Sequence, residues 1–196
     1  SVAAIDDRTA IAAGAGIGFT DVVIEPMPSV MLITRDGGAT WGELRISGDY
    51  RARALDALGD GLHAWISGEA CIPQPEGFGC AERRYAMLRT DDGGRSWGTV
   101  DGVGPFINLD FVSADVGWAQ AYYCDEQYAC GQTLQRTEDG GRTWAVVRGS
   151  TTPQPGATIA ALSPLDAQTA VIAESTCGVD GSCATTMLIT ADAGAT

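Results

Sequence analysis

The chain has 196 residues, 45% of them hydrophobic, and its 25 acidic and 12 basic side chains give a formal net charge of −13. Nucleic acids and anionic membranes attract positively charged proteins, so this balance predicts that neither is a partner. No apolar run has the length of a membrane-spanning helix and no signal peptide is recognisable. We therefore expect no direct membrane insertion by these residues, and any export signal or anchor should lie outside them.

Four kinds of short apolar segment recur in a fixed order along the chain, and runs of this length between polar turns predict strands. The first kind comprises VAAI (2–5), LDAL (55–58), LDFV (109–112) and IAAL (159–162). The second comprises AIAAG (10–14), HAWIS (63–67), GWAQA (117–121) and AVIAE (170–174). The third comprises VMLIT (30–34), YAMLRT (85–90), TLQRT (133–137) and MLIT (187–190). The fourth comprises GELRI (42–46), GTV (98–100) and AVV (145–147).

Each segment of the third kind leads into a motif of the form Ser/Thr-x-Asp-x-Gly-x-Ser/Thr-Trp. Its copies are TRDGGATW (34–41), TDDGGRSW (90–97), TEDGGRTW (137–144) and the shorter TADAGAT (190–196). They begin 56, 47 and 53 residues apart (34 to 90, 90 to 137, 137 to 190), which is the period of a propeller blade. We expect a turn in which the aspartate carboxylates accept hydrogen bonds from backbone N–H groups and the tryptophan rings are buried against the turn. These residues are Asp36, Trp41, Asp92, Trp97, Asp139, Trp144 and Asp192.

The repeat predicts an all-β fold, a β-propeller built of about four four-stranded antiparallel blades. We expect one domain over 1–196 with blades at about 1–48, 49–103, 104–150 and 151–196. Trp65 and Trp118 should lie in the core between blades. The first unit begins with its innermost strand and the fourth stops before its outermost strand. Because an unpaired edge invites pairing, we expect part of a larger propeller or a ring that a homodimer closes.

The motif resembles the Asp-box, or BNR repeat, and three of its four copies match the full pattern. The pairing of GWAQA (117–121) with TEDGGRTW (137–144) most resembles the BNR propellers of the photosystem II assembly factor-like group, over essentially the whole chain. Sialidases, sortilin-type receptors and xyloglucan-cleaving hydrolases share the box more distantly. The resemblance implies that the box aspartates lie at the blade periphery and hold turns. For some relatives it also implies a chaperone-like or assembly role.

The six cysteines form three local pairs, each bracketing the loop between the second and third strands of a unit. The pairs are Cys71/Cys80, Cys124/Cys130 and Cys177/Cys183. Hairpin strands bring such residues within disulfide range, and although fifteen pairings exist, proximity favours the sequential one. Zinc binding is the competing interpretation, but the spacings are wide and His63 is the only histidine. Persistent disulfides predict an extracytoplasmic setting: secreted, periplasmic or cell-surface.

Catalysis has less support in the sequence than binding. The resemblance to sialidases implies an arginine cluster, a Tyr/Glu pair and a general acid. The early Arg-Ile-Pro signature of that family is absent from this chain. The trio Arg83-Arg84-Tyr85 is a weak substitute, because adjacent residues of a strand point to opposite faces. Other glycosidases need two carboxylates across the scissile bond, for which Asp56 and Asp110 occupy equivalent positions. Solvated channel-lining groups are their alternative interpretation. His63 has no apparent acid partner, and no catalytic residue, metal or cofactor is predicted.

Recognition through the loops that the cysteines bracket is the remaining function, because braced loops lose less entropy on binding. Aromatic and acidic residues in or beside these loops suit a protein or carbohydrate contact. The candidates are Phe78, Tyr122, Tyr123, Asp125, Glu126 and Tyr128. Packing of one or two tyrosines within the blade is the alternative. The sequence thus predicts a non-enzymatic scaffold or recognition module for a protein or glycan. A glycoside hydrolase, sialidase-like or another BNR-propeller glycosidase, or a fragment of one, is the second hypothesis.

Overall fold

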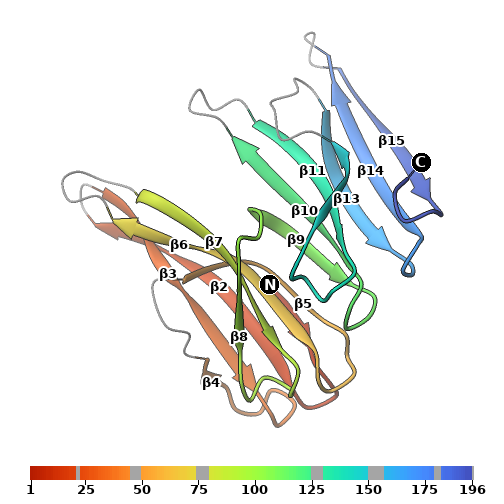
Figure 1. The fold of residues 1–196 in the computed structure, drawn as a ribbon. Helices are drawn as coiled ribbons and strands as arrows, with labels where there is room; N and C mark the ends of the chain where they lie inside the picture. Colours follow the sequence, from red (N-terminus) through yellow and green to blue (C-terminus); the bar gives the residue numbers. More distant parts are fainter. Residues whose placement is uncertain are drawn as a thin grey trace. The chain divides into compact units, whose positions relative to one another are not determined.

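The computed structural model describes residues 1–20, 23–44, 50–73, 80–124, 130–149, 157–178 and 182–195. Within these ranges the secondary structure consists of β-strands and contains no helix, which confirms the predicted all-β class (Figure 1). A helix long and apolar enough to cross a membrane is accordingly not found in this part of the chain.

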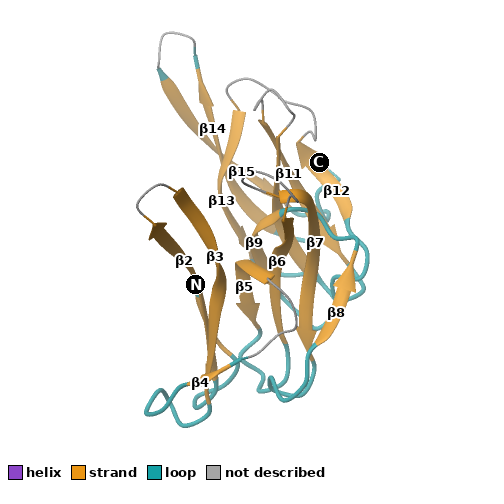
Figure 2. Ribbon diagram, turned by 90° about the vertical axis from the view of Figure 1, so that its left-hand side faces the viewer, coloured by secondary structure: helices purple, strands orange, loops and turns teal. Residues whose placement is uncertain are grey.

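The described strands form four antiparallel sheets, and in each sheet the strands pair in chain order (Figures 1 and 2). The first sheet contains β1 (Val2–Ala4), β2 (Ala10–Thr20), β3 (Val23–Thr34) and β4 (Gly42–Glu43). The second contains β5 (Tyr50–Ala57), β6 (Ala64–Pro73), β7 (Cys80–Thr90) and β8 (Gly98–Asp101). The third contains β9 (Phe106–Phe111), β10 (Gly117–Cys124), β11 (Cys130–Thr137) and β12 (Ala145–Gly149). The fourth contains β13 (Ala157–Pro164), β14 (Ala170–Cys177) and β15 (Cys183–Thr190).

Two compact units divide the chain, Ser1–Gly104 and Pro105–Thr196. Each unit holds two of the sheets. The sheets span 2–43, 50–101, 106–149 and 157–190, each inside one of the blade ranges given above. That the four sheets make one domain stays a prediction.

The core of the first unit lies between its two sheets. The buried apolar residues of this core are Ile5, Ile11, Ala13, Met31, Tyr50, Ala64, Ile66 and Leu88. Tyr50 is the polar exception, and its hydroxyl donates to the backbone oxygens of Ile66 (3.0 Å) and Ala86 (2.8 Å). Burial raises the pKa of Tyr50, so the hydroxyl keeps its proton and remains a donor. The ring therefore ties together strands β5, β6 and β7.

The core of the second unit repeats this plan with different residues. Trp118 and Leu134 of the third sheet pack with Ile159, Ala170 and Ile172 of the fourth. Trp118 is 0% exposed, and in the first unit Trp65 is also 0% exposed, as the sequence predicts for these two rings. They occupy corresponding positions, because Trp65 pairs with Arg89 and Trp118 with Arg136, each directly before the threonine of the repeated motif.

The strands extend beyond the apolar runs that predicted them. The predicted second and third strands of the first unit, 10–14 and 30–34, leave residues 15–29 as a loop. That prediction is wrong, because β2 runs to Thr20 and β3 starts at Val23. Backbone pairing needs no apolar side chain, so a hairpin continues wherever N–H and C=O groups still meet. The register shifts between Ala15 and Ile17, close to where Pro26 pairs with Ile17.

Candidate functional site

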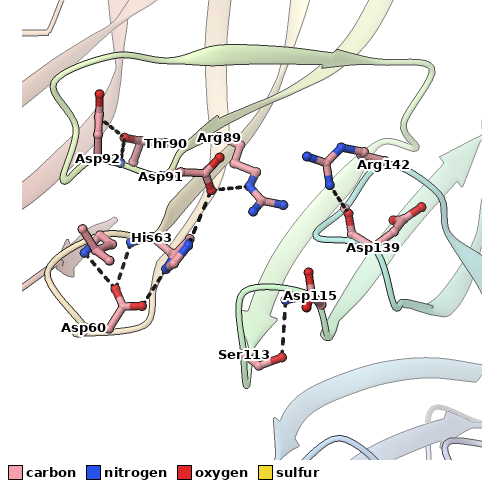
Figure 3. Close-up of polar contacts among 12 residues, drawn as sticks. Asp60, His63, Arg89, Thr90, Asp91, Asp92, Ser113, Asp115, Asp139 and Arg142 are labelled. Carbon is pink, nitrogen blue, oxygen red and sulfur yellow. Dashed lines mark hydrogen bonds and ion pairs between the residues drawn. The ribbon is translucent and has the colours of Figure 1, made fainter.

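The repeated motif forms a hydrogen-bonded turn between the third strand of a sheet and the residues after it. In the second sheet the Thr90 hydroxyl donates to Asp92 Oδ1 (2.8 Å) (Figure 3). The same hydroxyl accepts a hydrogen bond from the N–H of Gly94 (2.9 Å). Asp92 also accepts the N–H of Ser96 (2.9 Å) and its hydroxyl (2.6 Å). The same contacts recur around Asp36 and Asp139. At Asp192 the two contacts of the threonine hydroxyl recur: Thr190 donates to Asp192 and accepts the N–H of Gly194. Each aspartate thus holds a turn.

These hydrogen bonds keep the turn aspartates ionised. Donation from the side chain and the backbone of Thr40 lowers the pKa of Asp36 to about 2, from 3.8. The corresponding bonds from Ser96 lower the pKa of Asp92 further. Burial acts to raise the pKa of Asp139, but the bonds from Thr143 outweigh it and the pKa is lowered. A general acid needs a carboxyl group that stays protonated near neutral pH, so these three residues are unsuited to that role.

The tryptophans of the turns differ in burial. Trp41 is 42% exposed, so the expectation that its ring is buried against the turn is wrong. Trp97 is half-buried and packs against the core of the first unit. Trp144 is also half-buried, with its ring centroid 4.7 Å from that of Phe106 and 5.9 Å from that of Phe111. Burial of the indole therefore depends on which apolar side chains each sheet places beside the turn.

Among the described residues, disulfides close two hairpins at the ends of the strands opposite the repeated turns. In the third sheet Cys124 and Cys130 are direct partners across β10 and β11, with Cα atoms 4.0 Å apart. In the fourth sheet Cys177 and Cys183 are partners across β14 and β15, with Cα atoms 4.1 Å apart. Each pair belongs to a ladder of consecutive antiparallel partners. We call these two hairpin tips the closed ends.

Two of the predicted contact residues lie directly beside a closed end. Tyr122 is 41% exposed, and its backbone N–H donates to the oxygen of Pro105 (3.2 Å). Tyr123 is half-buried, and its hydroxyl accepts a hydrogen bond from Gln135 Nε2 (2.8 Å). Tyr122 is therefore accessible to solvent, whereas the hydroxyl of Tyr123 is bonded within the sheet.

Other predicted residues lie outside the described part of the chain. They are Phe78, Asp125, Glu126 and Tyr128. The side chains of Cys71 and Cys80 also lie outside the described side chains, so the third predicted disulfide stays a prediction. The backbone there is described, and Cys80 pairs with Pro73.

His63 has the acid partner that the sequence did not reveal, so that expectation is wrong. Its Nδ1 lies 2.6 Å from Asp60 Oδ2, and its Nε2 lies 3.6 Å from Asp91 Oδ1 (Figure 3). Asp91 in turn accepts a hydrogen bond from Arg89 Nε (2.7 Å). Asp60 reaches His63 because its Oδ1 caps the turn, accepting the N–H groups of Leu62 (2.8 Å) and His63 (2.9 Å). The cluster joins this turn to the strand end beside the repeated motif and supports the local fold.

The two acids considered for glycoside hydrolysis occupy equivalent places in different units. Asp56 on β5 pairs with Trp65, and Asp110 on β9 pairs with Trp118. Both carboxylates are half-buried and both have interactions within the protein. The described residues contain no group of three or more His, Cys, Asp or Glu placed to hold a metal ion.

A small apolar cavity lies between the third and fourth sheets within the second unit. Its volume is about 120 Å³, below the several hundred Å³ of a usual ligand site. The lining residues are Leu134, Val147, Arg148, Ala170, Ile172, Leu188, Ile189, Thr190 and Gly194. None is a carboxylate, and the Arg148 side chain forms an ion pair with Glu174. Because exposed Ile189 forms part of its lining, the cavity is partly open to solvent, but it is small and offers no carboxylate. The closed ends are the better candidate site.

Known proteins match this chain in structure and not in sequence: no family model and no curated protein matches it. YCF48 bound to D1 peptide superposes with a TM-score of 0.53 and 18% identity over 89% of this chain and 49% of that one. A protein of unknown function from Dyadobacter fermentans gives 0.60 and 16% identity over 100% and 65%. The Hadza microbial sialidase gives 0.58 and 16% identity over 100% and 44%.

These similarities show the fold. The chain has the antiparallel all-β sheets of a β-propeller. It spans less than two thirds of the length of each of these three structures. At these identities the similarity shows the architecture alone, because one fold can serve many functions.

Proposed function

We propose that this chain is a non-enzymatic, extracytoplasmic propeller module that recognises a protein or glycan through its closed ends. The observation that carries the proposal is the pairing of Cys124 with Cys130 next to the exposed ring of Tyr122. A disulfide across a hairpin tip limits the conformations of that tip before a partner arrives. Less conformational entropy is then lost on association. Exposed tyrosine is among the side chains that contribute most to protein interfaces.

The electrostatics of the carboxylates favours binding over acid catalysis. Among the described residues, each carboxyl group with a resolved shift has its pKa lowered by hydrogen bonds. They are Asp6, Asp36, Asp60, Glu82, Asp92, Asp139, Asp166 and Glu174. A glycosidase acid has a raised pKa. These eight carboxylates therefore support turns and ion pairs.

The identity of the repeat supports the same proposal. We propose that the turns at 34–41, 90–97 and 137–144 are Asp-boxes and that the chain is related to the photosystem II assembly factor-like BNR propellers. The shared Thr–Asp–Gly contacts in three turns support this relation. YCF48, which has this fold, has been solved with a D1 peptide bound, so a peptide is one class of partner to test.

The same disulfides support a secreted, periplasmic or cell-surface location. Cys124–Cys130 and Cys177–Cys183 would be reduced in most cytosols, whereas an oxidising compartment preserves them. The surface charge suits such a setting, because a net charge of −13 favours solubility and disfavours nucleic acid.

A glycoside hydrolase is the second candidate function. The equivalence of Asp56 and Asp110 in the two units favours it, as does the shared fold with a sialidase. Such an enzyme would need the two carboxylates at a defined separation across a glycosidic bond. Substitution of either acid would then abolish turnover while leaving binding of substrate in place.

One experiment separates the two functions. The oxidised protein is applied to arrays of peptides and glycans, and each retained glycan is then incubated with the protein and analysed for cleavage. Retention without cleavage is expected, with retention lost in Tyr122→Ala and kept in Val146→Ala, a matched exposed residue on β12. Cleavage by the wild type that Asp56→Asn or Asp110→Asn abolishes would establish the hydrolase instead. Absence of any retained ligand would contradict the proposal.

A homodimer that completes the ring stays part of the proposal. Within the described residues β15 pairs with β14 along one edge only, and its Met187 and Ile189 are each 67% exposed. Such edges are stabilised by pairing with another strand. Light scattering coupled to size exclusion should give a mass near twice 20.3 kDa, and a compact monomer would contradict the dimer.

A further inference from the structure

The small cavity of the second unit corresponds to the place of a tryptophan ring in the first unit. Trp97 packs against the core of the first unit, and a Cβ atom added to Gly94 would be 3.7 Å from its Cζ2. The cavity of about 120 Å³ in the second unit lies beside Gly194. Gly94 and Gly194 each donate their N–H to the threonine four residues earlier in the repeated motif (2.9 Å), so the two glycines are equivalent.

The residues around the two places are equivalent as well. Strand register aligns identical residues of the second and fourth sheets: Ala64 with Ala170, Ile66 with Ile172, Leu88 with Leu188, and Thr90 with Thr190. In the fourth sheet each of these residues lines the cavity. The neighbouring sheet adds Met31 in the first unit and Leu134 in the second, each three residues before a motif threonine. The lining therefore repeats the surface on which Trp97 packs.

The cavity has the size and the access that one aromatic side chain needs. An apolar cavity of about 150 Å³ takes up benzene, so a cavity close to that volume has room for one ring. Exposed Ile189 forms part of the lining, and the cavity opens to solvent on that side. Trp97 is itself only half-buried. An indole therefore needs no deeper enclosure than this cavity provides.

The strand beside the cavity has an edge for the residues that follow such a ring. In the second sheet β8 begins at Gly98, directly after Trp97, and pairs with β7 through Thr99 and Leu88. β15 is the equivalent of β7 in the fourth sheet, and among the described residues it pairs with β14 alone. The backbone N–H and C=O groups along an edge of this kind bind an added strand.

The described part of this chain offers no free segment that starts with tryptophan. Trp65 and Trp118 are buried in the cores. Trp41, Trp97 and Trp144 lead into β4, β8 and β12, and each of these strands is paired within its own sheet. These are the five tryptophans of the sequence. A glycan has neither an indole nor backbone N–H groups, so the segment that fits is one from a partner protein.

We propose that the cavity and the edge of β15 bind a tryptophan-led extended segment of a partner protein. The indole enters the cavity, and the residues after it pair with β15 as a fourth strand of the fourth sheet. In strand addition, backbone hydrogen bonds supply affinity and a side-chain pocket supplies specificity. The site lies at the end of the strands that carries the repeated turn, opposite the closed ends. It therefore goes beyond the function proposed above.

The probe is the blocked peptide acetyl-Trp-Gly-Thr-Val-Asp-amide, which reproduces residues 97–101. Isothermal titration should show saturable binding of one peptide per chain. The peptide with alanine in place of its tryptophan should bind at least tenfold more weakly, because it cannot fill the cavity. Absence of saturable binding, or equal binding of the two peptides, overturns the proposal.

Two N-methylated peptides test the pairing with β15. The N–H groups of successive residues in a strand point to opposite sides, so a methyl group on the threonine nitrogen or on the valine nitrogen removes a donor from one side only. One of the two peptides should bind at least tenfold more weakly than the parent peptide, and the other should stay within twofold of it. Equal affinities of the two peptides would show that the segment does not pair as a strand and would overturn the proposal.

Variants place the binding at the cavity. Ile189→Asp puts a carboxylate at its open side and should weaken peptide binding at least tenfold, because an apolar ring would then desolvate a charge. Leu165→Asp is the matched control: Leu165 is 63% exposed against 67% for Ile189 and does not line the cavity, so binding should stay within twofold of wild type. Ala170→Leu fills the cavity and should also weaken binding. If Ala170→Leu does not fold, the exposed Ile189 decides, and unchanged binding in Ile189→Asp overturns the proposal.

Two further variants test a second copy and the closed ends as sources of the result. If light scattering shows a dimer that Trp41→Ala dissociates, and Trp41→Ala binds the peptide at least tenfold more tightly than wild type, a second copy fills the cavity and the proposal is wrong. Tyr122→Ala should leave peptide binding within twofold of wild type. Loss of binding in Tyr122→Ala would assign the peptide to the closed end. Binding that Ile189→Asp abolishes and Tyr122→Ala preserves is independent of the closed ends, so each proposal fails or stands by itself.

Discussion

Gly68 lies against Tyr50 so closely that a Cβ atom added to Gly68 would be 2.7 Å from Cζ of the tyrosine ring. The same Cβ would be 2.1 Å from the backbone oxygen of Arg51. The ring cannot move aside without breaking its hydroxyl bonds to Ile66 and Ala86. Gly68 therefore allows β5 to approach β6 where Tyr50 crosses between the strands.

This contact predicts that Gly68→Ala destabilises the protein by about 3 kcal/mol, because backbone or ring must shift to admit the methyl group. Gly14→Ala is the matched control, since a Cβ there meets nothing within 4 Å. Removing a strand glycine in open space should be neutral or stabilise by up to about 1 kcal/mol. Urea unfolding measures both. Equal free energies of unfolding for the two variants would show that the close approach is unimportant.

The turn aspartates predict acid sensitivity. The folded pKa of Asp36, about 2, is below its ordinary value of 3.8, so its ionised form stabilises the fold. This contribution is complete above the unfolded pKa and is lost as the pH falls from about 4 through about 2. Calorimetry should show Tm falling across that interval, with a shallower fall in Asp36→Asn. Asp7→Asn, a change at an exposed aspartate outside the repeated motif, should follow wild type. A profile for Asp36→Asn identical to that of wild type would contradict the assignment.

The two described disulfides predict equal losses of stability. Both close loops with a sequence separation of 6. On the chain-entropy model each contributes about 2–3 kcal/mol by restricting the unfolded chain. Cys124→Ser/Cys130→Ser and Cys177→Ser/Cys183→Ser should therefore lose similar amounts in urea unfolding. Double variants as stable as the oxidised wild type would mean that neither disulfide restricts the unfolded chain.

The features that recur in each repeat could be predicted from the sequence. The motif spacing and the apolar runs indicated the strand order of each sheet, because a turn with fixed chemistry locates the strands on either side of it. The cysteine positions indicated the two described disulfides for the same reason, since each pair keeps a constant distance from the motif. Trp65 and Trp118 were placed in the core by their equivalent positions.

Features that do not repeat could not be predicted. Exposure of Trp41 depends on the side chains beside one particular turn, and the long hairpin of β2 and β3 depends on backbone pairing that leaves no apolar pattern. The contact between Arg53 and Glu69 requires a register shift, which one sequence does not show. The contact between His63 and Asp60 could have been predicted from the Asp-x-x-His spacing, because an aspartate that caps a turn lies close to the residue three positions later.

The central claim is that the closed ends bind a partner and do not catalyse its conversion. Isothermal titration of a ligand retained on the arrays tests it directly, with wild type, Tyr122→Ala and Cys124→Ser/Cys130→Ser compared under oxidising conditions. The account predicts a dissociation constant at least tenfold larger in both variants, a change within twofold in the control Val146→Ala, and recovery of the ligand unaltered. Unchanged affinity in both variants, or a ligand converted to product, would contradict it.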